Sequence, residues 1–274
     1  MSGEPIIRAL NLRKEYSSGS GKVLAVDSVS FELHANESLA IVGESGSGKT
    51  TVAKMLVGLE SLSGGSLDVL GASRTHLPRT AAQRRRWASQ VQYVFQDPYS
   101  SLNGRSRIGA IISTSIALHA TDKPDAATLR SRAMALLDSV GLPERFFDSF
   151  PHQMSGGQRQ RVAIARALAA NPLVLVLDEA VAALDVSIQA QILNLLNDIR
   201  AEREISYIFI THDLAVVRQV AERTLVMENG RIVDQGDTDT LLDTPSHPYT
   251  RALRAAVPGP GWRPRRRDDL ALAK

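Results

Sequence analysis

Cysteine is absent from the 274-residue sequence, which excludes disulfide bonds, thiolate-bound metals and cysteine-ligated iron–sulfur clusters. No run of 18 or more apolar residues occurs either, so no membrane-spanning helix is predicted. The N-terminal stretch MSGEPIIRALNLRKEY lacks a basic segment followed by an apolar core, and we therefore expect no secretory signal. These absences predict a chain that does not cross a membrane by itself.

The residues that are present fit an ordinary globular protein. Apolar residues make up 43% and charged residues 22%, which is enough apolar material for a core without help from metals. The formal net charge is +3, and two basic clusters occur at 83–87 and 262–269. We interpret these clusters as a solvated helix face and a loose tail rather than as binding sites for lipid head groups, and we expect no nucleic-acid partner.

Strand-like and helix-like patterns follow one another in an order that predicts an α/β fold with a helical insertion. Strands dominate up to residue 95, helices dominate from 104 to 170, and strand–helix alternation resumes at 173. The runs SLAIV, LVLVL and SYIFI are apolar throughout, as expected of strands buried on both faces of a sheet. Strands are predicted at 6–13, 23–33, 38–42, 66–70, 91–95, 173–177, 205–210, 223–228 and 231–235, and helices at 49–59, 104–119, 126–140, 156–170, 187–203 and 213–221.

This order indicates a single domain over residues 1–257. A helical block at about 97–170 is expected to be inserted into its α/β core. Residues 258–274 are expected to form a basic, weakly ordered tail.

A glycine-rich loop lies between a predicted strand and a predicted helix, in the stretch SLAIVGESGSGKTT. Gly43, Gly46 and Gly48 allow a tight turn that points successive backbone N–H groups at phosphate oxygens. Lys49 adds a positive charge for the β- and γ-phosphates, and Thr50 offers a hydroxyl ligand to Mg²⁺. A purely structural glycine turn is the alternative, but the strand before it and the helix after it favour a nucleotide site.

A second predicted strand ends in two carboxylates, in the stretch LVLVLDE at 173–179. Asp178 is predicted to hold Mg²⁺, and Glu179 to polarise an attacking water. A third strand ends in FITHDL, which places His212 at the sheet edge where α/β proteins bind ligands. A lone histidine is more often structural, but this position favours a contact to the γ-phosphate.

Two further glycines, Gly156 and Gly157, precede an amphipathic helix in the stretch HQMSGGQRQRVAIARAL at 152–168. The free N–H groups of a helix N-terminus attract phosphate, which predicts a second anion site. The alternative is a tight turn in front of a helix that packs in the core through Val162, Ile164 and Leu168. Both interpretations can hold together, because packing fixes the helix whose end binds phosphate.

The motifs described above, in their order along the chain, resemble those of the nucleotide-binding subunits of ATP-binding cassette (ABC) transporters. The resemblance covers about residues 6–257. GESGSGKTT is similar to the Walker A loop of that family, LVLVLDE to its Walker B strand, and MSGGQRQR to its signature sequence. Tyr16 resembles its adenine-stacking aromatic residue, and Gln96 its Q-loop glutamine. AALD, which ends in Asp185, resembles its D-loop.

The resemblance implies a P-loop NTPase fold of the ABC type, with a RecA-like α/β core, an antiparallel β subdomain and an inserted helical subdomain. It implies an ATPase that uses ATP and Mg²⁺. The implied nucleotide contacts are Tyr16, Gly43, Ser45, Gly46, Gly48, Lys49, Thr50, Thr51, Ser155, Gly156, Gly157, Gln158 and Asp185. The implied metal ligands are Thr50, Gln96 and Asp178, and the implied catalytic residues are Lys49, Gln96, Glu179 and His212.

The resemblance also implies partners. Two cassettes, identical or related, associate head to tail in this family, so that each ATP lies between the Walker A loop of one and the signature sequence of the other. We therefore expect a second ATPase subunit, two transmembrane permease subunits and, indirectly, a substrate-binding protein. The expected location is peripheral, on the cytoplasmic face of the cell membrane.

Three segments narrow the resemblance to importers of oligopeptides, dipeptides and nickel: FQDPYSSLNGR at 95–105, ALDVSIQAQILNLL at 183–196 and SHPYTRAL at 246–253. We expect import of di- or oligopeptides, with nickel or another small solute as the alternative. An exporter subunit also remains open. Tyr99 and Leu102 are expected to be exposed and to face the membrane subunits.

Four residues depart from the family pattern. Met154 replaces the usual leucine of the signature sequence, and Gly104 stands where proline is expected after Asn103. The other two departures are at positions where the family has proline after the Walker B glutamate and serine in the D-loop. Ala180 and Ala182 stand at these positions. We expect activity because the charged catalytic residues are all present, and a catalytically weak subunit of a heterodimer is the alternative. A chromosome-maintenance ATPase is disfavoured, because residues 50–154 are too few for a long coiled coil and show no sustained heptads.

Overall fold

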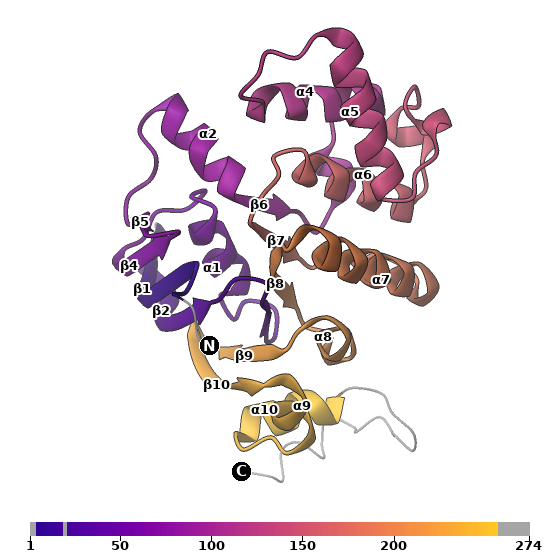
Figure 1. The fold of residues 1–274 in the computed structure, drawn as a ribbon. Coiled ribbons are helices and arrows are strands. Elements are labelled where there is room, and N and C mark those ends of the chain that lie inside the picture. The colour runs from indigo at the N-terminus through magenta and orange to yellow at the C-terminus, as the bar shows by residue number, and fades with distance from the viewer. Residues whose placement is uncertain (1–3, 19–20, 257–274) are drawn as a thin grey trace.

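Two β-sheets with helices around them make up the fold, which the computed structural model describes over residues 4–18 and 21–256 (Figure 1). The first sheet is antiparallel and has the strand order β2-β1-β4-β5. Its strands are β1 (Ile7–Ser18), β2 (Gly21–Leu33), β4 (Gly64–Val69) and β5 (Ala72–Ser73).

The second sheet has the order β10-β9-β3-β8-β7-β6, and its strands are parallel except for β10 at one edge. Its strands are β3 (Ser38–Val42), β6 (Val91–Val94), β7 (Val174–Asp178), β8 (Ser206–Thr211), β9 (Arg223–Glu228) and β10 (Arg231–Asp237). The carboxyl ends of β3, β8, β7 and β6 therefore meet at one edge of this sheet.

Two groups of helices lie at opposite ends of the molecule, with the second sheet and α7 between them (Figure 1). Helices α4, α5 and α6 lie together at one end, and α9 and α10 lie at the other. The helices are α1 (Lys49–Leu56), α2 (Ala81–Gln90), α3 (Pro98–Ser101), α4 (Ile108–His119), α5 (Ala126–Ser139), α6 (Gly156–Leu168), α7 (Val186–Arg203), α8 (Leu214–Val220), α9 (Thr238–Asp243) and α10 (Pro248–Ala256), with 3₁₀ turns at Glu144–Phe146 and Pro151–Gln153.

Hydrophobic cores lie on both faces of the second sheet, which explains its uniformly apolar strands. Ala40 and Val42 of β3 face a core shared with the helical block and α7, whereas Leu39 and Ile41 face a core shared with α1 and the first sheet. Every residue of β3, β7 and β8 is buried. The prediction of strands covered on both faces is confirmed.

The first sheet and the inserted helices differ from prediction in their bounds. Strands β1 and β2 extend further than expected and meet in a long hairpin. The helix predicted from residue 104 begins at Ile108, because Asn103 organises a turn before it. The side-chain Oδ1 of Asn103 accepts the N–H of Arg105 at 3.1 Å, and its carbonyl accepts the N–H of Ser106 at 3.0 Å.

Helices α3, α9 and α10 have no counterpart among the predicted elements, and α2 was expected only as the solvated helix face at 83–87. Within α2 no residue is buried, so hydrophobic periodicity gave no signal there. The available signal was a capping box, in which the Thr80 hydroxyl accepts the N–H of Gln83 and the Gln83 side chain accepts the N–H of Thr80.

The expected exposure of Tyr99 and Leu102 is half right. Tyr99 is 58% exposed, whereas Leu102 is only 5% exposed and belongs to the core of the helical block. The N–H of Leu102 closes a helical turn on the carbonyl of Pro98 at 3.2 Å, which turns the leucine inward. The expectation for Leu102 was therefore wrong.

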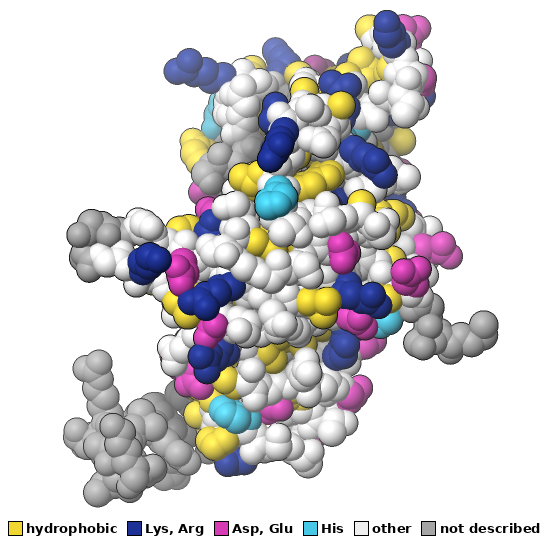
Figure 2. Space-filling view, turned by 90° about the vertical axis from the view of Figure 1, so that its left-hand side faces the viewer, with side chains coloured by type: hydrophobic (Ala, Val, Ile, Leu, Met, Phe, Trp, Pro, Cys, Tyr) yellow, Lys and Arg dark blue, Asp and Glu magenta, His cyan; other side chains and the backbone are white. Residues whose placement is uncertain are grey.

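On the face shown in Figure 2, acidic and basic side chains are interspersed and apolar side chains form only small areas. Over residues 4–18 and 21–256, no helix combines the length and hydropathy needed to cross a bilayer. The predicted basic tail at 258–274 lies outside the described residues.

Candidate active site

The phosphate loop (residues 43–50) connects β3 to α1 and depends on glycine at two positions of close approach. Gly43 has a φ of 154°, and a Cβ there would lie 2.1 Å from the carbonyl oxygen of Met227. Gly48 has a φ of 102°, and a Cβ there would lie 2.4 Å from the carbonyl oxygen of Ala25. Larger residues would push the loop off β9 and the first sheet, so these glycines fix where the loop can lie.

Lys49 is buried beneath the phosphate loop and bonds to its backbone. Its Nζ donates to the carbonyl oxygens of Gly43 at 2.8 Å and Glu44 at 2.7 Å. Burial lowers the pKa of Lys49, and the nearby carboxylates of Glu179 and Asp178 oppose that shift. The ammonium group therefore lies inside the loop, where a phosphate could replace the carbonyls as its partner.

Thr50 and Asp178 meet at the end of β7. The Thr50 hydroxyl donates to Oδ1 of Asp178 at 3.3 Å, and the buried Tyr93 hydroxyl donates to Oδ2. Burial raises the pKa of Asp178, and these two hydrogen bonds oppose the rise. A hydroxyl and a carboxylate side by side fit Mg²⁺, which usually takes few protein ligands and completes its shell with water and phosphate oxygens.

Glu179 lies between side chains from the two neighbouring strand ends. Gln96, just beyond β6, donates from Nε2 to Glu179 Oε2 at 2.6 Å. His212, just beyond β8, lies with Nδ1 at 3.2 Å from Glu179 Oε1. The backbone of Glu179 has a φ of 47°, which is uncommon outside glycine and occurs often at functional positions. The structure thus brings together three residues that are far apart in the sequence.

The signature segment (residues 154–158) begins α6, as a capping box. The Ser155 hydroxyl accepts the N–H of Gln158 at 3.3 Å, and Gln158 Oε1 accepts the N–H of Ser155 at 2.9 Å. A Cβ on Gly157 would lie 2.4 Å from Cγ2 of Ile188, whereas one on Gly156 would meet only Leu184, at 3.5 Å. Over the described ranges 4–18 and 21–256, no hydrogen bond or ion pair joins this segment to the phosphate loop.

The remaining predicted contacts lie at the edges of the site. Tyr16, on β1, is half-buried beside Lys14, whose Nζ is 4.9 Å from the ring centroid. Asp185 caps α7, accepting the N–H of Ile188 at 3.0 Å. Ser45 and Gly46 are exposed on the loop, and Thr51 is half-buried in the first turn of α1.

Two tyrosines at this site were missed by sequence reasoning. Tyr93 lies in a short strand, where it was taken only as one of a run of strand residues. Tyr249 lies on α10, and its hydroxyl accepts the N–H of Glu44 in the phosphate loop at 3.0 Å. The SHPYT stretch did mark the second of these, but nothing in it indicates a partner 205 positions away.

Comparisons with known proteins find ATP-binding proteins of transport systems. The dipeptide transport ATP-binding protein DppF of Haemophilus influenzae is 42% identical over 261 residues, which cover 93% of this chain and 78% of that protein. The glutathione import ATP-binding protein GsiA of Shigella dysenteriae is 44% identical over 265 residues, covering 94% of this chain and 42% of that one.

Solved structures and a family model also show similarity to ATP-binding cassettes of transporters. The ATP-binding cassette MJ0796, solved as a dimer bound to ADP and Pi, has a TM-score of 0.78 and 28% identity, covering 85% of this chain and 98% of its own. CbiO1 from Clostridium perfringens, part of the ABC transporter complex CbiONQ, has a TM-score of 0.74 and 26% identity, covering 89% and 97%. The family model described as "ABC transporter" matches residues 26–182, and the chain therefore belongs to the ABC transporter family, as an ATPase with its nucleotide-binding fold.

Proposed function

We propose that this chain hydrolyses ATP at the edge of its parallel sheet to power the import of di- or oligopeptides. The observation that carries the ATPase proposal is the position of Glu179, between Gln96 and His212 and next to the Thr50–Asp178 pair. Peptide import is supported by the names of relatives such as DppF, and by the FQDP and SHPYT segments of the sequence.

The proposed roles follow from the geometry. Lys49 would exchange its carbonyl partners for the β- and γ-phosphates, and Thr50 and Asp178 would hold Mg²⁺, which supplies positive charge against the phosphates when bound. Glu179 acts as the base toward an in-line water. Its two neighbours orient its carboxylate, Gln96 through its amide N–H and His212 through Nδ1. The amide oxygen of Gln96 would be a further ligand for the metal.

The proposed active unit is a head-to-tail dimer. The N-terminus of α6 presents the N–H groups of Gly156 and Gly157, yet this segment makes no bond to the phosphate loop of its own chain within the described residues. The similarity to MJ0796, which was solved as a dimer, supports a partner cassette that supplies the facing phosphate. Tyr16 and Asp185 are proposed as the outer nucleotide contacts, with Ser45, Gly46 and Thr51 on the loop itself.

The proposed partners are a second ATPase subunit and two permease subunits, which place the chain peripherally on the cytoplasmic face of the membrane. The exposed Tyr99, just after Gln96, is the proposed contact to the permeases. A substrate-binding protein acts on the far side of the permeases and does not touch this chain.

Reconstitution of the complete transporter in liposomes tests the proposal. With ATP and the binding protein present, we expect uptake of labelled di- and tripeptides together with phosphate release. Lys49→Ala is expected to lack both, because no other described ammonium group lies inside the phosphate loop. Phosphate release equal to that of Lys49→Ala would contradict the ATPase role, and phosphate release without uptake of any peptide would contradict the substrate class.

Tyr93→Phe is expected to weaken metal binding about 10- to 100-fold, the usual cost of removing a hydrogen bond to a metal ligand. The hydroxyl of Tyr93 orients the Asp178 carboxylate, and phenylalanine keeps the ring in its buried place. The measurement is Mn²⁺ affinity in the presence of ADP, by electron paramagnetic resonance. Metal-free ADP affinity is the control and should be unchanged, whereas an unchanged Mn²⁺ affinity would contradict the role of Tyr93.

A further inference from the structure

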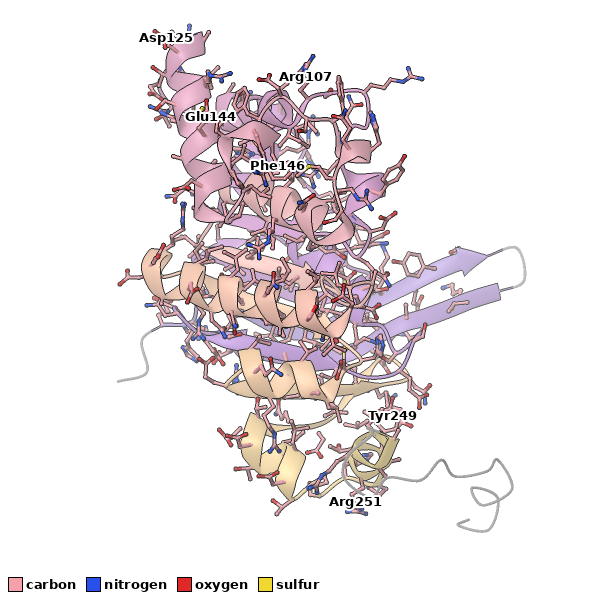
Figure 3. All side chains as sticks on the ribbon, turned by 90° about the vertical axis from the view of Figure 1, so that its right-hand side faces the viewer. Arg107, Asp125, Glu144, Phe146, Tyr249 and Arg251 are labelled. Atoms are coloured by element: carbon pink, nitrogen blue, oxygen red, sulfur yellow. The ribbon has the colours of Figure 1, made fainter. Side chains whose placement is uncertain are left out.

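Helix α10 reaches the phosphate loop through one side chain, Tyr249. Its hydroxyl accepts the backbone N–H of Glu44, the second residue of the loop, at 3.0 Å. The roles proposed above make no use of this contact. In Figure 3, Tyr249 lies on the side of α10 nearer the sheets, while Arg251 lies on its outer side.

The start of α10, which carries Tyr249, is fixed to the second sheet. Oδ2 of Asp234, on β10, accepts the buried Thr250 hydroxyl at 2.7 Å and the N–H of His247 at 3.3 Å. Pro248 occupies the first position of α10, where its fixed φ suits a helix start. The half-buried ring of Tyr249 packs against the core on the α7 face of the sheet. The tyrosine hydroxyl is therefore held in place by α10, β10 and the core together.

The peptide unit that Tyr249 binds is also the one that Lys49 binds. The carbonyl of Gly43 accepts from Lys49 Nζ at 2.8 Å, and the N–H of the same peptide, that of Glu44, donates to Tyr249. A phosphate in the loop would draw Lys49 away from the carbonyl side. Tyr249 accepts from the N–H side of the same peptide, so its hydrogen bond can persist when Lys49 leaves the carbonyl.

We propose that Tyr249 is a positioning residue that ties α10 to the phosphate loop, so that the helix and the loop become ordered together when a nucleotide binds. The inference rests on the proposed nucleotide site. On this proposal, the SHPYT segment acts on the nucleotide site of the ATPase and has no part in the choice of transported substrate. Because coupling between two sites is reciprocal, nucleotide binding should stabilise α10 by the same factor by which an ordered α10 raises the affinity of the loop for nucleotide.

Amide hydrogen exchange in the full chain, with and without ADP, tests this coupling. Tyr249→Phe keeps the ring and removes the hydroxyl. In the nucleotide-free protein it should speed exchange of the Glu44 amide about two- to tenfold, the factor expected from one ordinary hydrogen bond. In the wild type, ADP should slow exchange in α10 by a similar factor, and Tyr249→Phe should abolish that slowing.

Arg251→Ala is the matched control on the same helix. Arg251 bonds to the carbonyls of Ser246 and Pro245 and does not touch the phosphate loop, so Glu44 exchange should stay at the wild-type rate. Unchanged Glu44 exchange in Tyr249→Phe would overturn the inference, as would equal ADP protection of α10 in both proteins. If ADP fails to protect the amides of Lys49 and Thr50 in the wild type, the proposed nucleotide site itself is wrong, and that failure is seen without any variant.

Discussion

Glu179→Gln should reduce ATP hydrolysis by about 10²–10⁴-fold, the range typical for the loss of a general base. Glutamine keeps the size of the side chain and can still bond to Gln96 and His212, but it cannot take a proton from water. The fold and ATP binding should be preserved, because the carboxylate is partly exposed and makes no contact in the core. Steady-state phosphate release by the assembled transporter is the measurement.

Glu202→Gln is a suitable control for the lost charge, because Glu202 is exposed on α7. This variant should hydrolyse ATP at the wild-type rate. A Glu179→Gln rate above a tenth of the wild-type rate would show that another group activates the water, and would contradict the proposed role of Glu179.

Gly156→Asp should leave nucleotide binding to this chain intact while it prevents ATP-driven association with a partner cassette. The new carboxylate would stand at the α6 N-terminus, where the partner's γ-phosphate is proposed to dock. Two like charges about 4 Å apart repel by roughly 4 kcal/mol at an effective dielectric constant of 20. That repulsion corresponds to about a thousandfold weaker association. Sedimentation velocity with ATP and fluorescent-nucleotide binding are the two measurements.

Position 156 is preferable to 157 for this test because the added Cβ has room. A Cβ on Gly156 meets Leu184 at an ordinary 3.5 Å, whereas one on Gly157 would push into Ile188 at 2.4 Å and disturb α7. Gly156→Asn, neutral and of equal size, separates charge from bulk and should associate much more tightly than Gly156→Asp. Equal dimerisation of Gly156→Asp and wild type would mean that the signature segment does not face a phosphate.

The elements that could be predicted from the sequence are those in which burial requires a recognisable pattern of apolar residues. Strands β3, β7 and β8 are buried on both faces and read as unbroken apolar runs. Helix α2 has no fully buried residue and no apolar periodicity, so only its basic face at 83–87 and its capping box indicated it. Leu102 was misjudged because a single helical turn, closed on Pro98, decides which of two nearby apolar residues points inward.

In the candidate site, too, some contacts could be predicted from the sequence and others could not. Parallel strand ends made the proximity of Asp178, Glu179 and His212 predictable, because parallel strands end at one sheet edge. The bond from Tyr93 to Asp178 was not predictable, since a tyrosine in a buried strand usually means packing alone. The bond from Tyr249 to Glu44 depends on how α10 folds back against β10, and sequence spacing carries no information on that.

ATP-driven pairing of two cassettes can be observed directly in a variant that binds ATP but does not hydrolyse it. Light scattering should show purified Glu179→Gln as a monomer without nucleotide and as a dimer with ATP and Mg²⁺, because binding proceeds while hydrolysis, which would reopen the dimer, is blocked. The experiment is run with the chain alone and with the second ATPase subunit of its transporter, so that either pairing is detected. A chain that binds ATP yet stays monomeric in both cases would contradict the head-to-tail dimer.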